Sequence, residues 1–134
     1  MRLPGFRLKL WMLIVLVALV AVGIGAERTI QRVQNERERA AYYAGLEDDC
    51  RRDLARSAEI LAWRQRCAAF WRSRGVPDTA ARFEDYIPDD KSNVHYYRSS
   101  RDYYSRMRRK HERASRFPWP AVAPDPPPPE WSAR

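Results

Sequence analysis

The sequence predicts an all-α protein: an N-terminal transmembrane helix, then a small antiparallel helical hairpin or bundle, then an extended proline-rich tail. Three observations lead to this fold class. An uncharged apolar run stands near the start, apolar residues then recur at helical spacing, and most of the ten prolines gather near the C-terminus. The 134 residues leave room for one span and a single small soluble region with a modest core.

The apolar run extends from Leu10 to Ala26 and contains no charged side chain. At about 1.5 Å per residue it forms a helix of about 25 Å, slightly shorter than a hydrocarbon core of roughly 30 Å. Lys9 can snorkel toward the headgroups, and Trp11 stands where an aromatic belt residue would sit. We therefore predict a single membrane span over 10–26, preceded by a basic flank over 1–9.

The flanks of the span indicate its orientation. Because basic residues resist translocation and only a short segment precedes the span, we expect a cytoplasmic N-terminus and residues 27–134 outside. The alternative is a cleaved secretory signal, since small residues near Gly23 to Ala26 match a peptidase site, and the protein would then be secreted. Both interpretations export the chain from residue 27 onward.

The helical soluble region is expected over 27–117, with helices at about 27–44, 47–74 and 92–116. The first of these helices has a narrow seam of small and apolar residues at three- and four-residue steps. This seam would pair two chains as a homodimer, or would pack on the next helix. Gly45 is expected to end the helix, because acidic residues favourable to a new helix start follow it.

The second helix is expected to carry the core. Its apolar face is formed by Cys50, Leu54, Ala58, Leu61 and Ala68, and is widened by Ile60, Trp63, Cys67, Phe70 and Trp71. Two tryptophans in one helix predict a packed contact, most simply with the later helix. A Gly-Val-Pro sequence ends this helix, and Pro88 is expected to close the short helical turn that follows.

The two cysteines are not expected to pair within one helix. Cys50 and Cys67 would be about 25 Å apart along its axis, whereas disulfide-bonded Cα atoms approach within about 7 Å. We expect buried free thiols that behave as small apolar residues, with an intermolecular disulfide as the alternative. The sequence holds no CxxC and no Cys/His cluster, so neither a metal nor a cofactor is predicted.

The third helix combines tyrosines with most of the excess positive charge. Residues 92–117 hold eight basic side chains against two acidic ones, and tyrosines recur at heptad spacing. Cations and aromatic rings also mark nucleic-acid interfaces, but export of the segment argues against nucleic acid. The alternative function is peripheral binding of anionic lipid or cell-envelope polymer through 92–116. Arg106, Arg108, Arg109 and Lys110 would carry that binding.

The tail over 118–134 cannot be helical, because prolines fix φ and remove hydrogen-bond donors. An extended polyproline II arm is expected, and such arms dock in aromatic-lined grooves. The groove would belong to a partner, or to this chain with Trp119 and Val122 lying back over the final helices. The alternative is that the tail is a semi-rigid spacer or a free terminus. The candidate interaction residues are therefore Tyr96, Tyr103, Tyr104, Arg106, Arg108, Arg109, Lys110, Trp119, Pro126 and Pro127.

The end of the chain also resembles a known group of proteins. The residues that carry this resemblance are Tyr103-Tyr104-x-x-Met107-x-x-Lys110-His111-Glu112-x-Ala114 and Pro118-Trp119-x-x-Val122-x-Pro124-Asp125-Pro126-Pro127. They are similar to the ending of many small single-pass membrane proteins of planctomycete type, which close with a PW-x-x-V-x-PDPP tail. The resemblance implies a membrane span and no particular activity. This chain has Tyr43, Tyr97 and Tyr104 where a histidine often follows the tyrosine in that group.

The sequence contains no recognisable catalytic motif. His95 and His111 are more than about 20 Å apart on a straight helix, so within one chain they cannot share a metal or a proton. A glycine-rich phosphate loop, an HExxH motif and a plausible Ser/His/Asp set are all missing. We therefore predict a membrane-anchored structural or protein-interaction module that is not an enzyme and that has an unidentified protein partner.

Overall fold

The computed structural model describes residues 4–119 and 121–130, with side chains from residue 10 onward. Within these residues it has three helices and no strand: α1 over Pro4–Ser73, α2 over Pro77–Glu84 and α3 over Ile87–Arg116. The predicted all-α class is confirmed. The side chains of the predicted basic flank, Pro120, and tail residues 131–134 lie outside the described residues.

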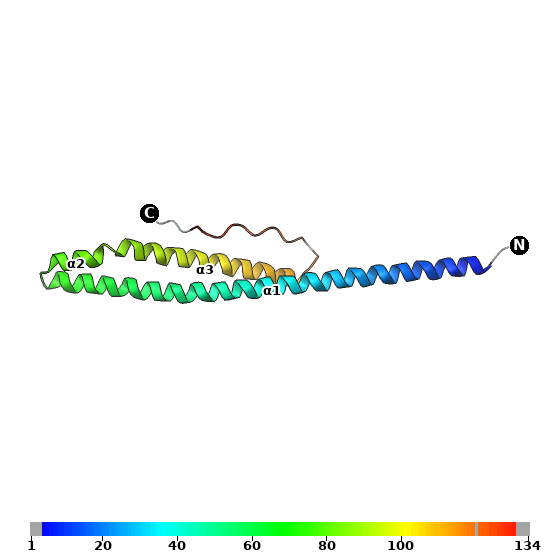
Figure 1. Cartoon of the computed structure of the whole chain (residues 1–134), viewed down its shortest axis with the longest axis horizontal. Helices are drawn as coiled ribbons and strands as arrows, with labels where there is room; N and C mark the ends of the chain where they lie inside the picture. The colour runs from blue at the N-terminus through cyan, green and yellow to red at the C-terminus, as the bar shows by residue number, and fades with distance from the viewer. Residues whose placement is uncertain (1–3, 120, 131–134) are drawn as a thin grey trace.

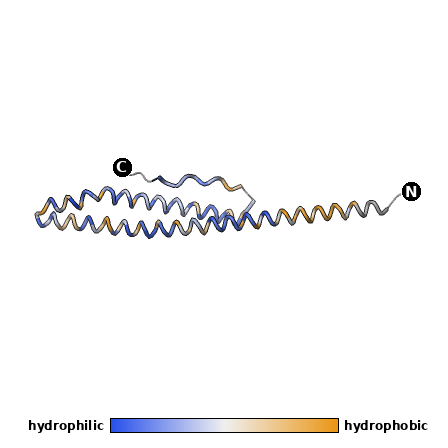
Figure 2. Tube along the Cα trace, viewed as in Figure 1, coloured by the Kyte–Doolittle hydropathy of each residue, from blue (hydrophilic) through white to orange (hydrophobic). Residues whose placement is uncertain are grey.

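α1 is one continuous helix that joins the apolar run to the soluble region (Figure 1). Its apolar part extends alone beyond the other helices, and Figure 2 shows it as the longest hydrophobic stretch of the chain. This helix lies near the N-terminus and is long and apolar enough to cross a membrane, and none of its most apolar window is buried. The predicted span over 10–26 is therefore a section of α1.

The predicted helix end at Gly45 is wrong, because α1 continues through this residue and the expected helices over 27–44 and 47–74 are parts of one element. A glycine inside a helix costs only about 1 kcal/mol relative to alanine. Packing of its neighbours offsets this cost, since Tyr43 stacks on α3 and Glu47 accepts a hydrogen bond from Arg108 there. The acidic residues after Gly45 therefore lie within α1 and do not mark the start of a new helix.

α1 ends where Gly75 takes a φ of 73°, a left-handed conformation that glycine adopts at no steric cost. Pro77 then occupies the first turn of α2, where its missing N–H removes no helical hydrogen bond. Pro88 has the same role in α3, with Asp89 and Asp90 in the acidic first turn. The expectation that Pro88 closes an element is therefore wrong, and α3 begins at Ile87 instead of residue 92.

α3 runs back along α1 (Figure 1), and three contacts define this register. The Arg64 guanidinium lies 3.1 Å from Asp90 Oδ2 at the start of α3. Arg108 Nε donates to Glu47 Oε2 at 2.9 Å in the middle of the pair. Near the end of α3, His111 meets Glu36. The last turn of α3 therefore lies beside the part of α1 that follows the apolar run.

The core between the helices is a narrow stripe of small and aromatic side chains. Its buried apolar members are Ala40, Ala68, Ala80, Tyr103, Met107 and Ala114. The wide face expected on the second helix is only partly covered, because Ala58 is exposed and Trp63 and Phe70 keep 51% and 50% of their surface exposed. A helix with one long partner buries one stripe, and covering the wider face would take a further helix.

Both cysteines are free and half-buried, not fully buried as the sequence suggested. Burial raises the pKa of the Cys50 thiol above its usual value, and the nearby carboxylates of Asp53 and Asp49 raise it further. Cys50 is therefore held in its thiol form at neutral pH, where it reacts slowly as a nucleophile.

Candidate functional site

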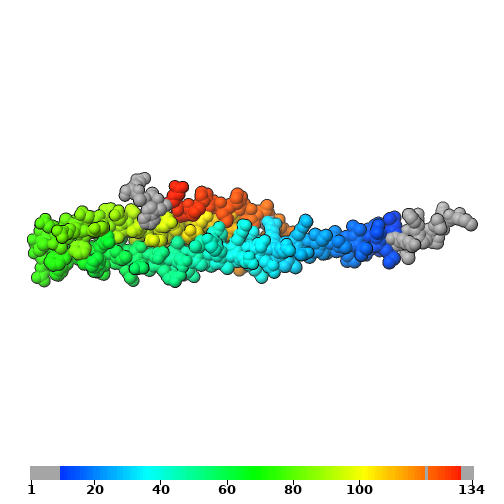
Figure 3. All heavy atoms as spheres, viewed as in Figure 1, coloured from blue at the N-terminus to red at the C-terminus, as the bar shows by residue number. Residues whose placement is uncertain are grey.

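A cluster of polar side chains joins α1, α3 and the tail through several hydrogen bonds. Figure 3 shows the tail lying directly against α3. We call the cluster the tail clasp and define it as Glu36 and Tyr43 of α1, Tyr103, Lys110 and His111 of α3, and Asp125 and Pro126 of the tail.

His111 is the centre of the tail clasp and is completely buried. Its Nδ1 lies 2.5 Å from Glu36 Oε2, and its Nε2 lies 3.1 Å from Asp125 Oδ2. The ring also stacks on Tyr43, with 5.4 Å between centroids and 16° between planes. One imidazole thus bridges a carboxylate of α1 and a carboxylate of the tail, while its face is covered by an aromatic side chain.

Asp125 connects the tail to three side chains of α1 and α3, those of Tyr43, Lys110 and His111. Lys110 Nζ donates to its Oδ1 at 2.5 Å, and Tyr43 Oη donates to its Oδ2 at 2.8 Å. Burial by itself opposes the charged form of this carboxyl, but hydrogen bonds from Lys110, Tyr43 and His111 together lower its pKa to about 2. The carboxylate is therefore ionised at neutral pH and holds the tail through charge-assisted hydrogen bonds.

The pKa of Tyr43 is shifted in the opposite direction to that of Asp125, upward. Burial, together with the hydrogen bond to the Asp125 carboxylate, raises the pKa of Tyr43 to about 12. Its hydroxyl is therefore a stable donor across the neutral range. Burial also raises the pKa of Tyr104, whose ring stacks on Tyr43 with centroids 6.2 Å apart.

The second attachment point of the tail is a backbone carbonyl. Tyr103 is buried, and its hydroxyl donates to the carbonyl oxygen of Pro126 at 2.6 Å. Prolines lack an N–H, so a proline-rich strand offers only carbonyl oxygens to its neighbours. Hydrogen-bond donors on α3 are the chemical complement of such a strand, and the tyrosine hydroxyl supplies one.

The predicted interaction residues separate into three groups. Tyr103, Lys110 and Pro126 belong to the tail clasp, and Tyr104 packs beside it. Half-buried Tyr96 packs edge to face on Tyr97, while Arg108 bonds to Glu47 and Glu112. Arg106, Arg109, Trp119 and Pro127 are exposed.

Four members of the tail clasp were not among the predicted interaction residues: Glu36, Tyr43, His111 and Asp125. His111 and Asp125 lie within the two motifs quoted above from the end of the sequence, so those motifs contain a signal for both. Glu36 lies in a run of alternating charges that is typical of a solvated helix face. Its neighbours in the sequence do not indicate that it is buried. Among the described residues, no group of three or more His, Cys, Asp or Glu side chains could hold a metal ion.

Comparison of the chain with protein-family models, with curated proteins and with solved structures found no match.

Proposed function

We propose that this chain is a membrane-anchored protein-interaction module, without a catalytic role, that presents a proline-rich arm from a helical stalk. The observation that supports this proposal is the tail clasp. It pins the arm at Asp125 and at the Pro126 carbonyl, while the rings of Pro124, Pro127 and Pro128 stay exposed.

Pinning gives the arm a thermodynamic advantage as a ligand. An extended proline-rich strand binds aromatic-lined grooves through the exposed faces of its rings. A free tail loses conformational freedom when it binds, whereas a pinned tail has lost part of that freedom already. The clasp therefore pre-organises the arm without covering the proline rings that a groove would contact.

The stalk would position this arm relative to the membrane. In this proposal the apolar part of α1 spans the bilayer with the N-terminus in the cytoplasm, and the rest of the chain stands outside. α1 continues as helix through Gly23 and Gly25, so the link from span to stalk is rigid. Residues 27–73 would rise about 70 Å from the membrane.

The other proposed contacts fit the structure less well. The seam over 27–44 that would form a homodimer is partly used by α3, because Ala40 is buried and Val33 and Ala44 are half-buried. The alternative of lipid or polymer binding by the basic helix loses two of its four cations, since Arg108 and Lys110 are engaged with carboxylates.

The single-pass planctomycete resemblance is compatible with this proposal. Its two motifs supply both sides of one contact, with Tyr103, Lys110 and His111 from the helix and Asp125 and Pro126 from the tail. A tail held on its own helix accounts physically for the occurrence of the two motifs together in this chain.

A pull-down from detergent-solubilised native membranes tests the proposal. The full chain is compared with a Pro127→Ala/Pro128→Ala variant, which changes exposed rings and leaves the clasp side chains intact. An Arg56→Ala/Arg66→Ala variant, altered at exposed positions of α1, is the matched control.

We expect a partner that survives high-salt washing, binds the control variant, and is lost with the proline variant. A partner that binds the proline variant as well as the native chain contradicts the proposal. Binding that disappears in salt and ignores the prolines would favour the lipid or polymer alternative.

A further inference from the structure

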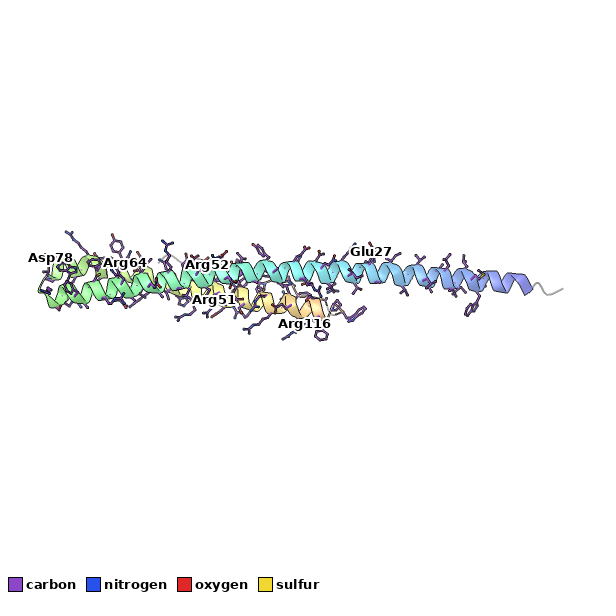
Figure 4. All side chains as sticks on the ribbon, turned by 90° about the horizontal axis from the view of Figure 1, so that it is seen from below. Glu27, Arg51, Arg52, Arg64, Asp78 and Arg116 are labelled. Carbon is purple, nitrogen blue, oxygen red and sulfur yellow. The ribbon has the colours of Figure 1, made fainter. Side chains whose placement is uncertain are left out.

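The chain reverses direction beside the end of the apolar run. α3 ends at Arg116, and the following residues leave the helix. Trp119 then lies across a hollow of about 500 Å³ from the last turns of the apolar run, lined on α1 by Val22, Gly25, Ala26, Thr29 and Ile30. Trp119 therefore lies level with the end of the proposed span, whereas Arg116 lies further along α1 from the apolar run, past Glu27 in Figure 4.

The reversal exposes two large aromatic side chains. Trp119 keeps 82% of its surface exposed and Phe117 keeps 63%. Exposed aromatic surface of this size is unfavourable in bulk water, but at headgroup level it is typical of membrane proteins, where the ring meets both apolar and polar surroundings. The location of these two residues beside the span fits that environment.

Basic side chains accompany the aromatic ones. Arg113 and Arg116 lie in the last turn of α3 and are both exposed. Arg113 also borders a largely apolar hollow of about 440 Å³ between α3 and the tail, to which Phe117 and Val122 contribute. An apolar hollow with cations at its edge, beside the part of α1 that follows the proposed span, matches the chemistry of an anionic phospholipid, which combines a phosphate with an apolar chain.

We propose that the membrane-side turn, defined as residues 113–119, is a second membrane contact that binds anionic phospholipid. Trp119 and Phe117 insert at headgroup level, and Arg113 and Arg116 contact the lipid phosphates. This inference rests on the proposed function only in requiring that the apolar part of α1 spans the bilayer. A second contact fixes the tilt of the stalk, because one helix in a bilayer is otherwise free to tilt.

The test uses the full chain with fluorinated tryptophan, reconstituted in lipid nanodiscs that contain a lipid with a paramagnetic headgroup. Fluorine NMR reports each tryptophan separately, and single Trp→Phe variants assign the resonances. We expect the Trp119 resonance to lose intensity, as does that of Trp11 in the proposed span. The Trp63 resonance is the internal control and should keep its intensity, because Trp63 lies about 55 Å along α1 from the end of the apolar run.

The outcomes separate the inference from the proposed function. Loss at Trp11 with full intensity at Trp119 would overturn the second contact and leave the anchor intact. Full intensity at both residues would overturn the anchor, and the second contact with it.

The choice of lipid is tested by comparing neutral phosphatidylcholine discs with discs containing phosphatidylglycerol. We expect greater loss at Trp119 in the anionic discs, and an Arg113→Gln/Arg116→Gln variant should reduce it to the neutral level. Each basic side chain near an anionic surface should strengthen docking about fivefold. An Arg56→Gln/Arg66→Gln variant carries the same charge change far from the membrane and should behave as the native chain. Equal loss in both kinds of disc would refute anionic recognition.

Discussion

Replacement of Asp125 by asparagine should detach the tail while leaving the helix pair intact. The native carboxylate has its pKa lowered from 3.8 to about 2 by the groups that surround it. This difference in pKa corresponds to about 2.5 kcal/mol between the ionised and neutral forms of the carboxyl. Because the side chain is 23% exposed and asparagine keeps part of the hydrogen bonding, we expect a loss of about 1–2 kcal/mol.

Thermal unfolding of the full chain in detergent, followed by circular dichroism, measures this loss. For a soluble region of this size, 1 kcal/mol corresponds to roughly 4–8 °C in Tm, so Asp125→Asn should lower Tm by about 4–16 °C. Asp53→Asn, at an exposed site on α1, is the matched control and should leave Tm nearly unchanged. A native Tm for Asp125→Asn would refute the claim that this carboxylate holds the tail.

Four further results are expected. Tyr103→Phe removes the donor to the tail carbonyl and should cost about 1 kcal/mol in the same unfolding assay; an unchanged Tm would show that this bond contributes nothing. Gly45→Ala should raise stability by about 0.5–1 kcal/mol, because the site is helical and open, and a decrease would contradict continuity of α1. Gly75→Ala should lower stability, because alanine is strained at a φ of 73°. Stability as a function of pH should fall at both extremes: the contribution of Asp125, whose folded pKa is lowered, is lost as pH falls from 3.8 through about 2, and that of Tyr43, whose folded pKa is raised, is lost as pH rises from 10 through about 12.

The parts of the fold that depend on local pattern were predictable from the sequence. The uncharged apolar run forms a long helix with no other helix packed against it, and its local pattern alone predicts this. The dense run of prolines cannot continue α3. Helix ends that depend on tertiary context were predicted wrongly. Gly45 and Pro88 both break helices in isolation, yet Gly45 is held in α1 by its packed neighbours, and Pro88 lies where a helix tolerates proline.

The tail clasp was predictable only in outline. Docking of the arm on its own helices was one of the expected alternatives, and Val122 does line a hollow against α3. The bonds themselves join residues far apart in the chain, such as Glu36 and His111. A charged residue in a polar run carries no local sign that it will be buried, because the burial is created by the partner helix. The sequence therefore indicates that the tail can dock, and the structure shows where it docks.

The central claim is that the proline-rich arm is held on α3 in the full chain. Its most direct test is NMR of the full chain in nanodiscs, with only proline and tyrosine isotopically labelled, to detect through-space contacts between the Tyr103 ring and Pro126. We predict cross-peaks between these residues that disappear in the Asp125→Asn variant. Proline signals at random-coil positions, without contacts to Tyr103, would contradict the claim.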